Sequence, residues 1–284
     1  MNYLCKTNFT LMTARSYRII ALILLLITLF LSSDSIYSQE NKGVRLEIRD
    51  SKKRQNFDYF RRVSLYNAAS GAFLESSSLM FSFENQFFMK ELMGKMVSSI
   101  ISFKKNTFIA KSNHSGYAKY GTLHLTAGYS RLFSKKFAVG MQFHYLLDHA
   151  SQYKAYHSLT FDVALHAQLN ERFSLGFLAY NPAGLKYHFT GDIAIPMLLK
   201  LNFAYNINRQ LLFCGSIEKA LPGFFNVSLG LDYSLSFLTL SGNVSLAHLD
   251  FHIGTYFRAF LIEITSKYHY HLGYSPALSF YYLF

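Results

Sequence analysis

Apolar and polar side chains alternate along most of the chain after residue 77. Between Phe137 and Leu147 every odd position is apolar, whereas the even positions are mostly small or polar. The segment from Ser158 to Leu169 repeats this pattern. Successive side chains of a β-strand point to opposite faces, so a period of two predicts strands with one apolar face and one polar face.

The same alternation predicts fourteen strands. The connections FSKK at 133–136, NER at 170–172 and NINR at 206–209 are short and polar, whereas those at 149–157, 182–195 and 269–275 are longer. Short turns at one end and longer loops at the other are typical of outer-membrane barrels. The expected strands span residues 78–84, 96–104, 107–114, 122–131, 137–148, 158–169, 173–181, 196–206, 210–219, 224–234, 237–246, 248–257, 259–268 and 276–284.

The length of these strands favours a membrane barrel over a soluble β-sandwich. Many have 9–12 residues, close to the roughly 9–11 that cross a bilayer at a tilt. Alternation alone fits both architectures, because a sandwich also has one apolar and one polar face per sheet. In lipid every backbone N–H and C=O must be paired, so a sheet has to close. We therefore predict an all-β fold, a transmembrane antiparallel β-barrel of 14 strands with an N-terminal plug segment.

Composition agrees with a sheet that contacts lipid. Charged residues make up 15% of the 284 residues, and a mean hydropathy of +0.13 is too polar for a bundle of membrane helices. The formal net charge is +12. For an exported chain, anionic lipid and lipopolysaccharide phosphate are more suitable counter-charges than nucleic acid. Basic turns without a dedicated ligand would give the same net charge.

The N-terminus has the three parts of a secretory signal peptide. Basic residues Lys6, Arg15 and Arg18 precede an unbroken apolar run at 19–31, and small residues follow up to Ser38. The alternative is a membrane anchor, but this run of thirteen residues is shorter than the roughly 17–25 that a spanning helix needs. We expect a signal peptide over 1–38, with cleavage after Ser38 and export to the outer membrane.

The segment between the signal and the first strand differs from the barrel. Residues 39–62 are basic and polar, so we expect a solvated periplasmic lead-in. Residues 63–77 are small and apolar without a strand pattern, which fits either a plug in the lumen or an ordinary loop before the first strand. The barrel with this hatch would occupy 63–284. Residues 84–92 would form one helical turn between strands.

The last strand resembles the insertion signal of bacterial outer-membrane barrels. Its outward row consists of Leu278, Phe280, Tyr282 and Phe284. Phe280, Tyr282 and Phe284 are therefore the expected membrane-insertion signal, through which the chain would contact the barrel assembly machinery.

Several motifs resemble FadL-like and PorV/PorQ-like outer-membrane proteins. They are YNAASGAFLES at 66–76, SLMFSFENQFFMKELMGK at 78–95, LGFLAYNPAGLKY at 175–187, SIEKAL at 216–221 and the closing segment at 268–284. Asn67, Ala68 and Ala69 stand where these families carry Asn-Pro-Ala, so the proline is missing. The resemblance implies a fourteen-stranded barrel with an N-terminal hatch. FadL-like members move hydrophobic molecules across the outer membrane, and PorV-like members serve the type IX secretion system.

Two groups of residues are candidate sites. The first would bind a hydrophobic ligand or form the plug, and consists of Asn67, Ala68, Ala69, Phe73, Leu74, Phe87 and Phe88. The second is polar and faces the lumen, and consists of His124, His144, Asp162, His166, His248, Asp250 and His252. Histidine beside carboxylate can form a metal site or a proton relay. However, side chains two apart on one strand are about 7 Å from each other, so we expect a solvated lining or a hydrogen-bond network without metal.

These observations lead to one main functional hypothesis and one alternative. We expect a passive channel for hydrophobic small molecules, with no cofactor and no enzymatic activity, because no G-x-S-x-G motif or Ser-His pairing stands out. The alternative is an accessory outer-membrane component of the type IX secretion system, with secretion-system proteins as partners.

Overall fold

The computed structural model describes residues 51–151, 155–185 and 195–284. The chain divides into two compact units, 1–46 and 47–284, and all described residues belong to the second. The expected signal peptide at 1–38 and the first part of the expected lead-in, 39–50, lie outside the described residues.

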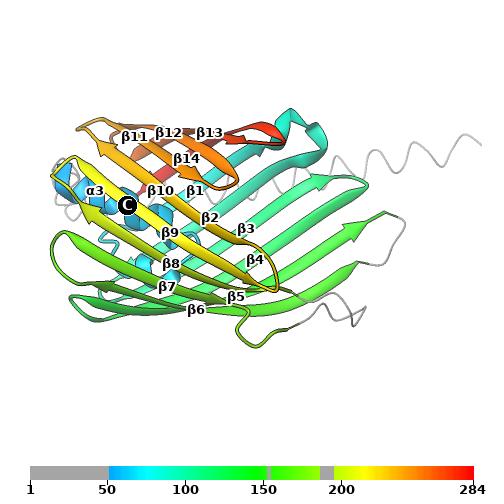
Figure 1. Ribbon diagram of the computed structural model, residues 1–284, viewed down its shortest axis with the longest axis horizontal. Helices are drawn as coiled ribbons and strands as arrows, with labels where there is room; N and C mark the ends of the chain where they lie inside the picture. Colours follow the sequence, from blue (N-terminus) through cyan, green and yellow to red (C-terminus); the bar gives the residue numbers. More distant parts are fainter. Residues whose placement is uncertain (1–50, 152–154, 186–194) are drawn as a thin grey trace, which may run out of the picture. The chain divides into compact units, whose positions relative to one another are not determined.

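Fourteen antiparallel strands form a closed barrel in which β1 pairs with β14 (Figure 1). This confirms the predicted fold class, and each predicted strand end lies within three residues of the observed one. The strands are β1 (Ser78–Asn85), β2 (Met93–Phe103), β3 (Asn106–Tyr117), β4 (Tyr120–Ser134), β5 (Phe137–Ala150), β6 (Tyr156–Gln168), β7 (Phe173–Tyr180), β8 (Met197–Asn206), β9 (Leu211–Leu221), β10 (Phe225–Ser234), β11 (Leu238–Ser245), β12 (His248–Phe257), β13 (Phe260–His269) and β14 (Gly273–Leu283).

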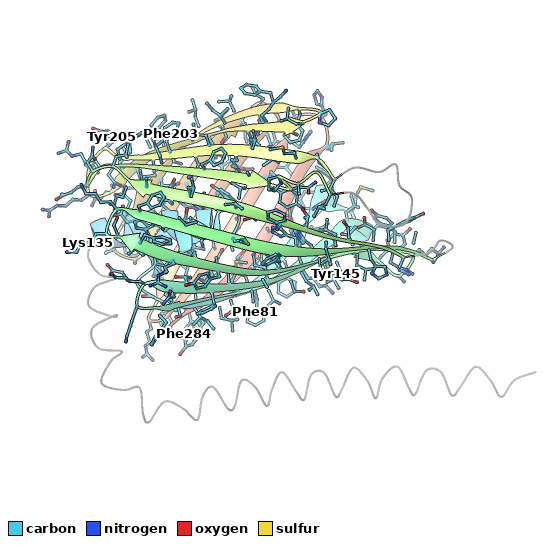
Figure 2. All side chains as sticks on the ribbon, turned by 90° about the horizontal axis from the view of Figure 1, so that it is seen from below. Phe81, Lys135, Tyr145, Phe203, Tyr205 and Phe284 are labelled. Atoms are coloured by element: carbon cyan, nitrogen blue, oxygen red, sulfur yellow. The ribbon has the colours of Figure 1, made fainter. Side chains whose placement is uncertain are left out.

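The alternating pattern separates an apolar outer surface from a polar inner surface. On β5 the inward residues Ala138 and Gln142 are both 0% exposed, whereas the outward Phe143 is 60% exposed. Figure 2 shows many side chains projecting from the outside of the barrel, among them Phe81 and Tyr205. A continuous outer layer of Phe, Leu, Ile and Val is suited to acyl chains and would be costly in water.

The connections differ between the two ends of the barrel. At the end where the last strand finishes, they have two to four residues. The other end carries the 3₁₀ turns η2 (Gln86–Phe88) and η3 (Lys90–Leu92), and the long connection 181–196. The predicted helical turn at 84–92 is present, as are longer connections at 151–155 and 181–196, but the connection predicted at 269–275 has only three residues, 270–272. We refer to the two ends as the turn end and the loop end.

Two helices, α3 (Ser51–Ser64) and α4 (Ala68–Gly71), lie inside the barrel at the turn end (Figure 1). This differs from the solvated lead-in expected for 51–62. Phe57, Tyr59 and Phe60 of α3 pack with wall residues such as Leu261 and Tyr281 in one apolar cluster. The polar residues of α3 predict exposure to solvent, but in the structure they face a barrel wall that is itself polar. No helix in the described ranges is long and apolar enough to cross a membrane.

A charge on the outer surface should destabilise the barrel in lipid. We expect Phe143→Arg to lower the free energy of unfolding in lipid vesicles by about 2–4 kcal/mol, because Phe143 lies in the middle of β5 on the apolar face. Lys135→Ala, in a turn at one end of the barrel (Figure 2), is the control and should have little effect. Equal unfolding midpoints in urea for the two variants would contradict a lipid-facing outer surface.

Candidate functional site

The segment 51–77 is a plug that fills the turn end of the lumen, and Asn67 joins it to the wall. The Asn67 side chain caps α4 by accepting a hydrogen bond from the Ser70 backbone N–H at 3.3 Å. Its amide nitrogen donates to the carbonyls of Leu165 and Phe177 at 3.4 and 3.3 Å. Ala68 occupies the first helical position, which suits the proline of the related motifs. Here the helical turn forms without proline because the asparagine cap satisfies its first amides.

Ala68 and Ala69 are completely buried where α4 touches β5. A Cβ atom at Gly140 would lie 2.6 Å from the Ala69 nitrogen and 2.8 Å from the Ala68 Cβ. The wall therefore needs glycine at this position for the plug to approach it. The sequence did not reveal this requirement, since glycine is also common on inner barrel faces for other reasons.

The expected ligand group is divided between the two ends of the barrel. Phe73 packs against Phe60 and His166, with ring centroids 5.2 and 5.1 Å apart, and Leu74 is buried in the plug. Phe87 and Phe88 instead lie in η2 at the loop end, where Phe88 is 67% exposed. The structure therefore brings Asn67, Ala68, Ala69, Phe73 and Leu74 together, but not Phe87 and Phe88.

Arg61 of α3 is a fully enclosed charge of the plug, with 1% of its surface exposed. Its Nη2 atom donates to Glu263 Oε2 at 3.0 Å and lies 3.7 Å from Asp58 Oδ1. The guanidinium carbon lies 4.0 Å from the centre of the Tyr281 ring. A buried charge is stable only when it is paired and hydrogen-bonded, so Glu263 and Tyr281 fix where this turn of α3 can lie.

Further polar contacts hold the adjacent residues of α3. Arg62 pairs with Asp232 of β10, and the Tyr256 hydroxyl of β12 donates to Asp58. Burial raises the pKa of the Asp58 carboxyl, while the nearby Arg61 and Arg62 act in the opposite direction. The plug is therefore held both by these polar contacts, whose partners water can replace, and by the apolar cluster around Phe57, Tyr59 and Phe60.

The charge on the inner wall complements the basic plug. The described strands place seven acidic residues on the inner face against three lysines, Lys111, Lys200 and Lys267, an excess of four negative charges. Segment 51–64 contains five basic residues and one acid. This complementarity favours the plug inside the barrel. The acids are Glu84, Asp148, Asp162, Glu218, Asp232, Asp250 and Glu263.

Three of the predicted lumen residues form one hydrogen-bonded row across β4, β5 and β6. His124 Nε2 lies 3.1 Å from His144 Nδ1, and His144 Nε2 lies 2.7 Å from Asp162 Oδ2. The Thr126 hydroxyl lies 3.1 Å from His144 Nδ1. Among the described residues, no three His, Cys, Asp or Glu side chains come together as metal ligands would. The row is a buried network that can orient protons and rigidify this wall.

The remaining predicted lumen residues have separate partners. His166 Nδ1 lies 2.8 Å from the Ser70 hydroxyl, which places this histidine in the plug interface. His248 lies 3.3 Å from Asp250 on the same strand, and His252 Nδ1 lies 2.9 Å from the Thr265 hydroxyl. The seven residues therefore form four separate groups, and no single site contains them all.

A cavity of about 450 Å³ extends from the plug along β8–β14, β1 and β2. The plug contributes Tyr59, Arg62, Val63, Leu65 and Tyr66, and the wall contributes mainly hydroxyl, amide and charged side chains. The free thiol of Cys214 also lines this cavity. The cavity is the principal candidate for a binding site.

Sequence reasoning missed Arg61, Arg62 and Glu263, although a signal for them exists. Glu263 stands between the outward residues Ile262 and Ile264, so alternation places this carboxylate inward. A wall with excess acid needs a counter-charge, and the adjacent arginines of 61–62 could have been assigned to it.

The expected insertion signal forms the outward row of β14. Phe280 is exposed, and the Tyr282 and Phe284 rings stack with centroids 5.6 Å apart. The backbone N–H of Ser77 donates to the Phe284 carbonyl at 2.9 Å, which extends the pairing that closes the barrel.

Removing the partner of Arg61 should release the helix. We expect Glu263→Gln to destabilise docking of α3 by about 3–5 kcal/mol, because an uncompensated guanidinium would remain buried. Amide hydrogen exchange of 51–64 should then accelerate by about 100-fold or more. Glu84→Gln, which removes an inner carboxylate that pairs with neither arginine, is the matched control. Unchanged exchange in Glu263→Gln would show that the ion pair does not hold the plug.

No family model and no curated protein matches this sequence. Solved structures do match. The toluene transporter TodX of Pseudomonas putida aligns with a TM-score of 0.57 and 12% identity, over 78% of this chain and 94% of that one. The monoaromatic hydrocarbon channel CymD aligns with a TM-score of 0.54 and 10% identity, over 78% and 92%. At this identity the likeness shows the fold.

The FadL-like part of the predicted resemblance is confirmed at the level of fold, because both structures are channels of the FadL family, whereas the PorV/PorQ-like part stays a prediction. The chain therefore has the fold of the FadL-type outer-membrane channels, a closed antiparallel β-barrel.

Proposed function

We propose that this protein is a passive outer-membrane channel for hydrophobic small molecules, closed at the turn end by the plug 51–77. One observation carries the proposal: the cavity of about 450 Å³ inside the barrel ends on plug residues Val63, Leu65 and Tyr66. A molecule in the cavity would therefore contact the element that blocks further passage. The similarity to TodX, a toluene transporter, and to CymD, a monoaromatic hydrocarbon channel, supports this substrate class.

Gating requires that the plug can leave its position without loss of the barrel. The barrel wall closes through its own strand pairing, including β1 with β14. The plug contacts the wall through side chains and single carbonyl hydrogen bonds, for example between Lys111 Nζ and the Leu65 carbonyl. Displacement of the plug would therefore break polar contacts that water can replace. No bond is made or broken in this function, and we propose no enzymatic activity.

The proposal places the protein in the outer membrane, after export by the signal at 1–38. The apolar outer surface would contact lipid, and the basic turns would face lipopolysaccharide or other anionic headgroups. The outward row of Phe280, Tyr282 and Phe284 would be recognised by the barrel assembly machinery. A role beside the type IX secretion system has support only from the sequence resemblance.

Uptake by intact cells tests the function. We expect cells that contain the protein to accumulate labelled fatty acid or monoaromatic hydrocarbon faster than cells that lack it, because outer leaflets rich in lipopolysaccharide slow such molecules. Cells with Lys135→Ala should take up the label like the unchanged protein, whereas the destabilised Phe143→Arg should take up less, which would link uptake to an intact barrel. Equal uptake across a broad panel would remove the transport proposal, and co-purification with secreted proteins would favour the accessory role instead.

Gly140 offers a direct test of the plug as the gate. We expect Gly140→Val to displace α4 and to raise single-channel conductance in planar bilayers several-fold, because a Cβ atom there would overlap Ala68 and Ala69. Gly242→Val is the matched control, since the nearest side-chain atom to its Cβ would be 3.9 Å away. Equal conductance of Gly140→Val, Gly242→Val and the unchanged protein would show that the plug does not control the path.

A further inference from the structure

Beside Arg62 and Tyr59, the plug side of the cavity has an apolar part, which we call the floor. Val63, Leu65 and Tyr66 form it from the plug side, and Met80 of β1 and Met96 of β2 join them from the wall. Methionine side chains are flexible and polarisable, so they adapt to ligands of different shape. This part of the cavity can bury a short hydrocarbon body.

The wall above the floor has the opposite character. It presents hydroxyl and amide groups of Ser82, Ser216, Ser228, Ser241, Asn243 and Thr265. Two hydroxyl pairs bridge neighbouring strands, Ser216 with Ser228 and Ser82 with Ser279, each at 2.8 Å. Every hydroxyl can both donate and accept, so the wall retains hydrogen-bonding capacity for a further polar partner.

This polarity disfavours a bare hydrocarbon that fills the whole cavity. Such a ligand would displace water from the hydroxyl and amide groups without replacing its hydrogen bonds. Each buried polar group left unsatisfied weakens binding. A ligand with its own hydroxyl groups avoids this cost and still covers the apolar floor.

The charges of the lining indicate a neutral ligand. Arg62 is already paired with Asp232, and Glu263 is paired with Arg61. The other formally charged residues of the lining are Glu84 and Lys267, one of each sign. The cavity therefore has at least as many carboxylates as cationic side chains, so an anionic head group gains no net electrostatic attraction there.

We infer that the cavity binds a neutral amphiphile, with a short apolar body on the plug floor and a hydroxyl-rich head group, of the glycoside type, against the wall of β9–β13. This inference rests on the proposed function and narrows its substrate class. The volume of about 450 Å³ falls in the range of roughly 300–1,000 Å³ that small-molecule sites occupy.

Binding can be measured with an introduced tryptophan, because the chain contains none. Tyr66→Trp places a single fluorescent reporter on the cavity floor, and Met96→Trp places a second one on the wall, in case the first variant does not assemble. Phe251→Trp, on the lipid-facing side of β12, is the matched control for probes that only dissolve in the membrane. The full chain would be studied in lipid nanodiscs with hexyl glucoside, glucose and toluene as probes.

We expect hexyl glucoside to change the emission of the cavity reporters in a saturable way, whereas Phe251→Trp responds linearly or not at all. Glucose and toluene should bind the cavity at least about tenfold more weakly, because each lacks one half of the contacts. Toluene binding as tightly as hexyl glucoside would overturn the inference but leave hydrophobic transport intact. A lack of saturable change with every probe would overturn the inference, and uptake assays would then decide the proposed function separately.

A wall variant tests the head-group contacts. Asn243→Leu in the reporter background should weaken the binding of hexyl glucoside by about five- to tenfold through loss of hydrogen bonding. The same variant should bind toluene equally well or more tightly. Val244→Leu, at the adjacent outward position of β11, is the control. An equal effect of both variants, or none from Asn243→Leu, would contradict recognition of a polar head by this wall.

Discussion

Buried ion pairs between the plug and the wall determine how the lumen is organised. Arg61 reaches Glu263 on β13 and Arg62 reaches Asp232 on β10, so two consecutive residues of α3 are bound to different strands. Separating Arg61 from Glu263 inside the barrel would leave a buried charge without its partner, which is costly. The helix can therefore dock in one register, and the cavity beside it acquires its floor from the residues that this register exposes.

The polar lumen also explains how so short and mixed a helix is stable. Isolated helices of this length are marginal in water, and helices in proteins depend on tertiary packing. Here Phe57, Tyr59 and Phe60 pack into an apolar cluster, while Asp58 and Arg61 of the same helix meet polar wall groups. A helix buried on all sides needs such a surrounding, because its polar faces would be unsatisfied in an apolar core.

The location of the cavity follows from the same arrangement. At the turn end, α4 lies beside β3–β6, where Gly140 allows it to contact the wall, and α3 contacts β10. The remaining space lies along β8–β14 and is bordered by both apolar plug residues and polar wall residues. In a channel with these properties, the ligand would bind next to the plug that closes the path.

The alternation of side chains was sufficient to determine fourteen strands, their inward and outward faces and the closed barrel, since these depend on a period of two and on backbone pairing in lipid. Residues such as His144 and Asp162 could be assigned to the lumen for the same reason. Sequence patterns could not determine that 51–62 enters the barrel, because lysine and arginine indicate solvent unless the opposing acids are known. Only the tertiary structure brought Arg61 to Glu263, which lies 202 residues away, separated Phe87 and Phe88 from the plug and enclosed the cavity. Contacts between positions so distant depend on strand register around a closed barrel, and no local pattern encodes them.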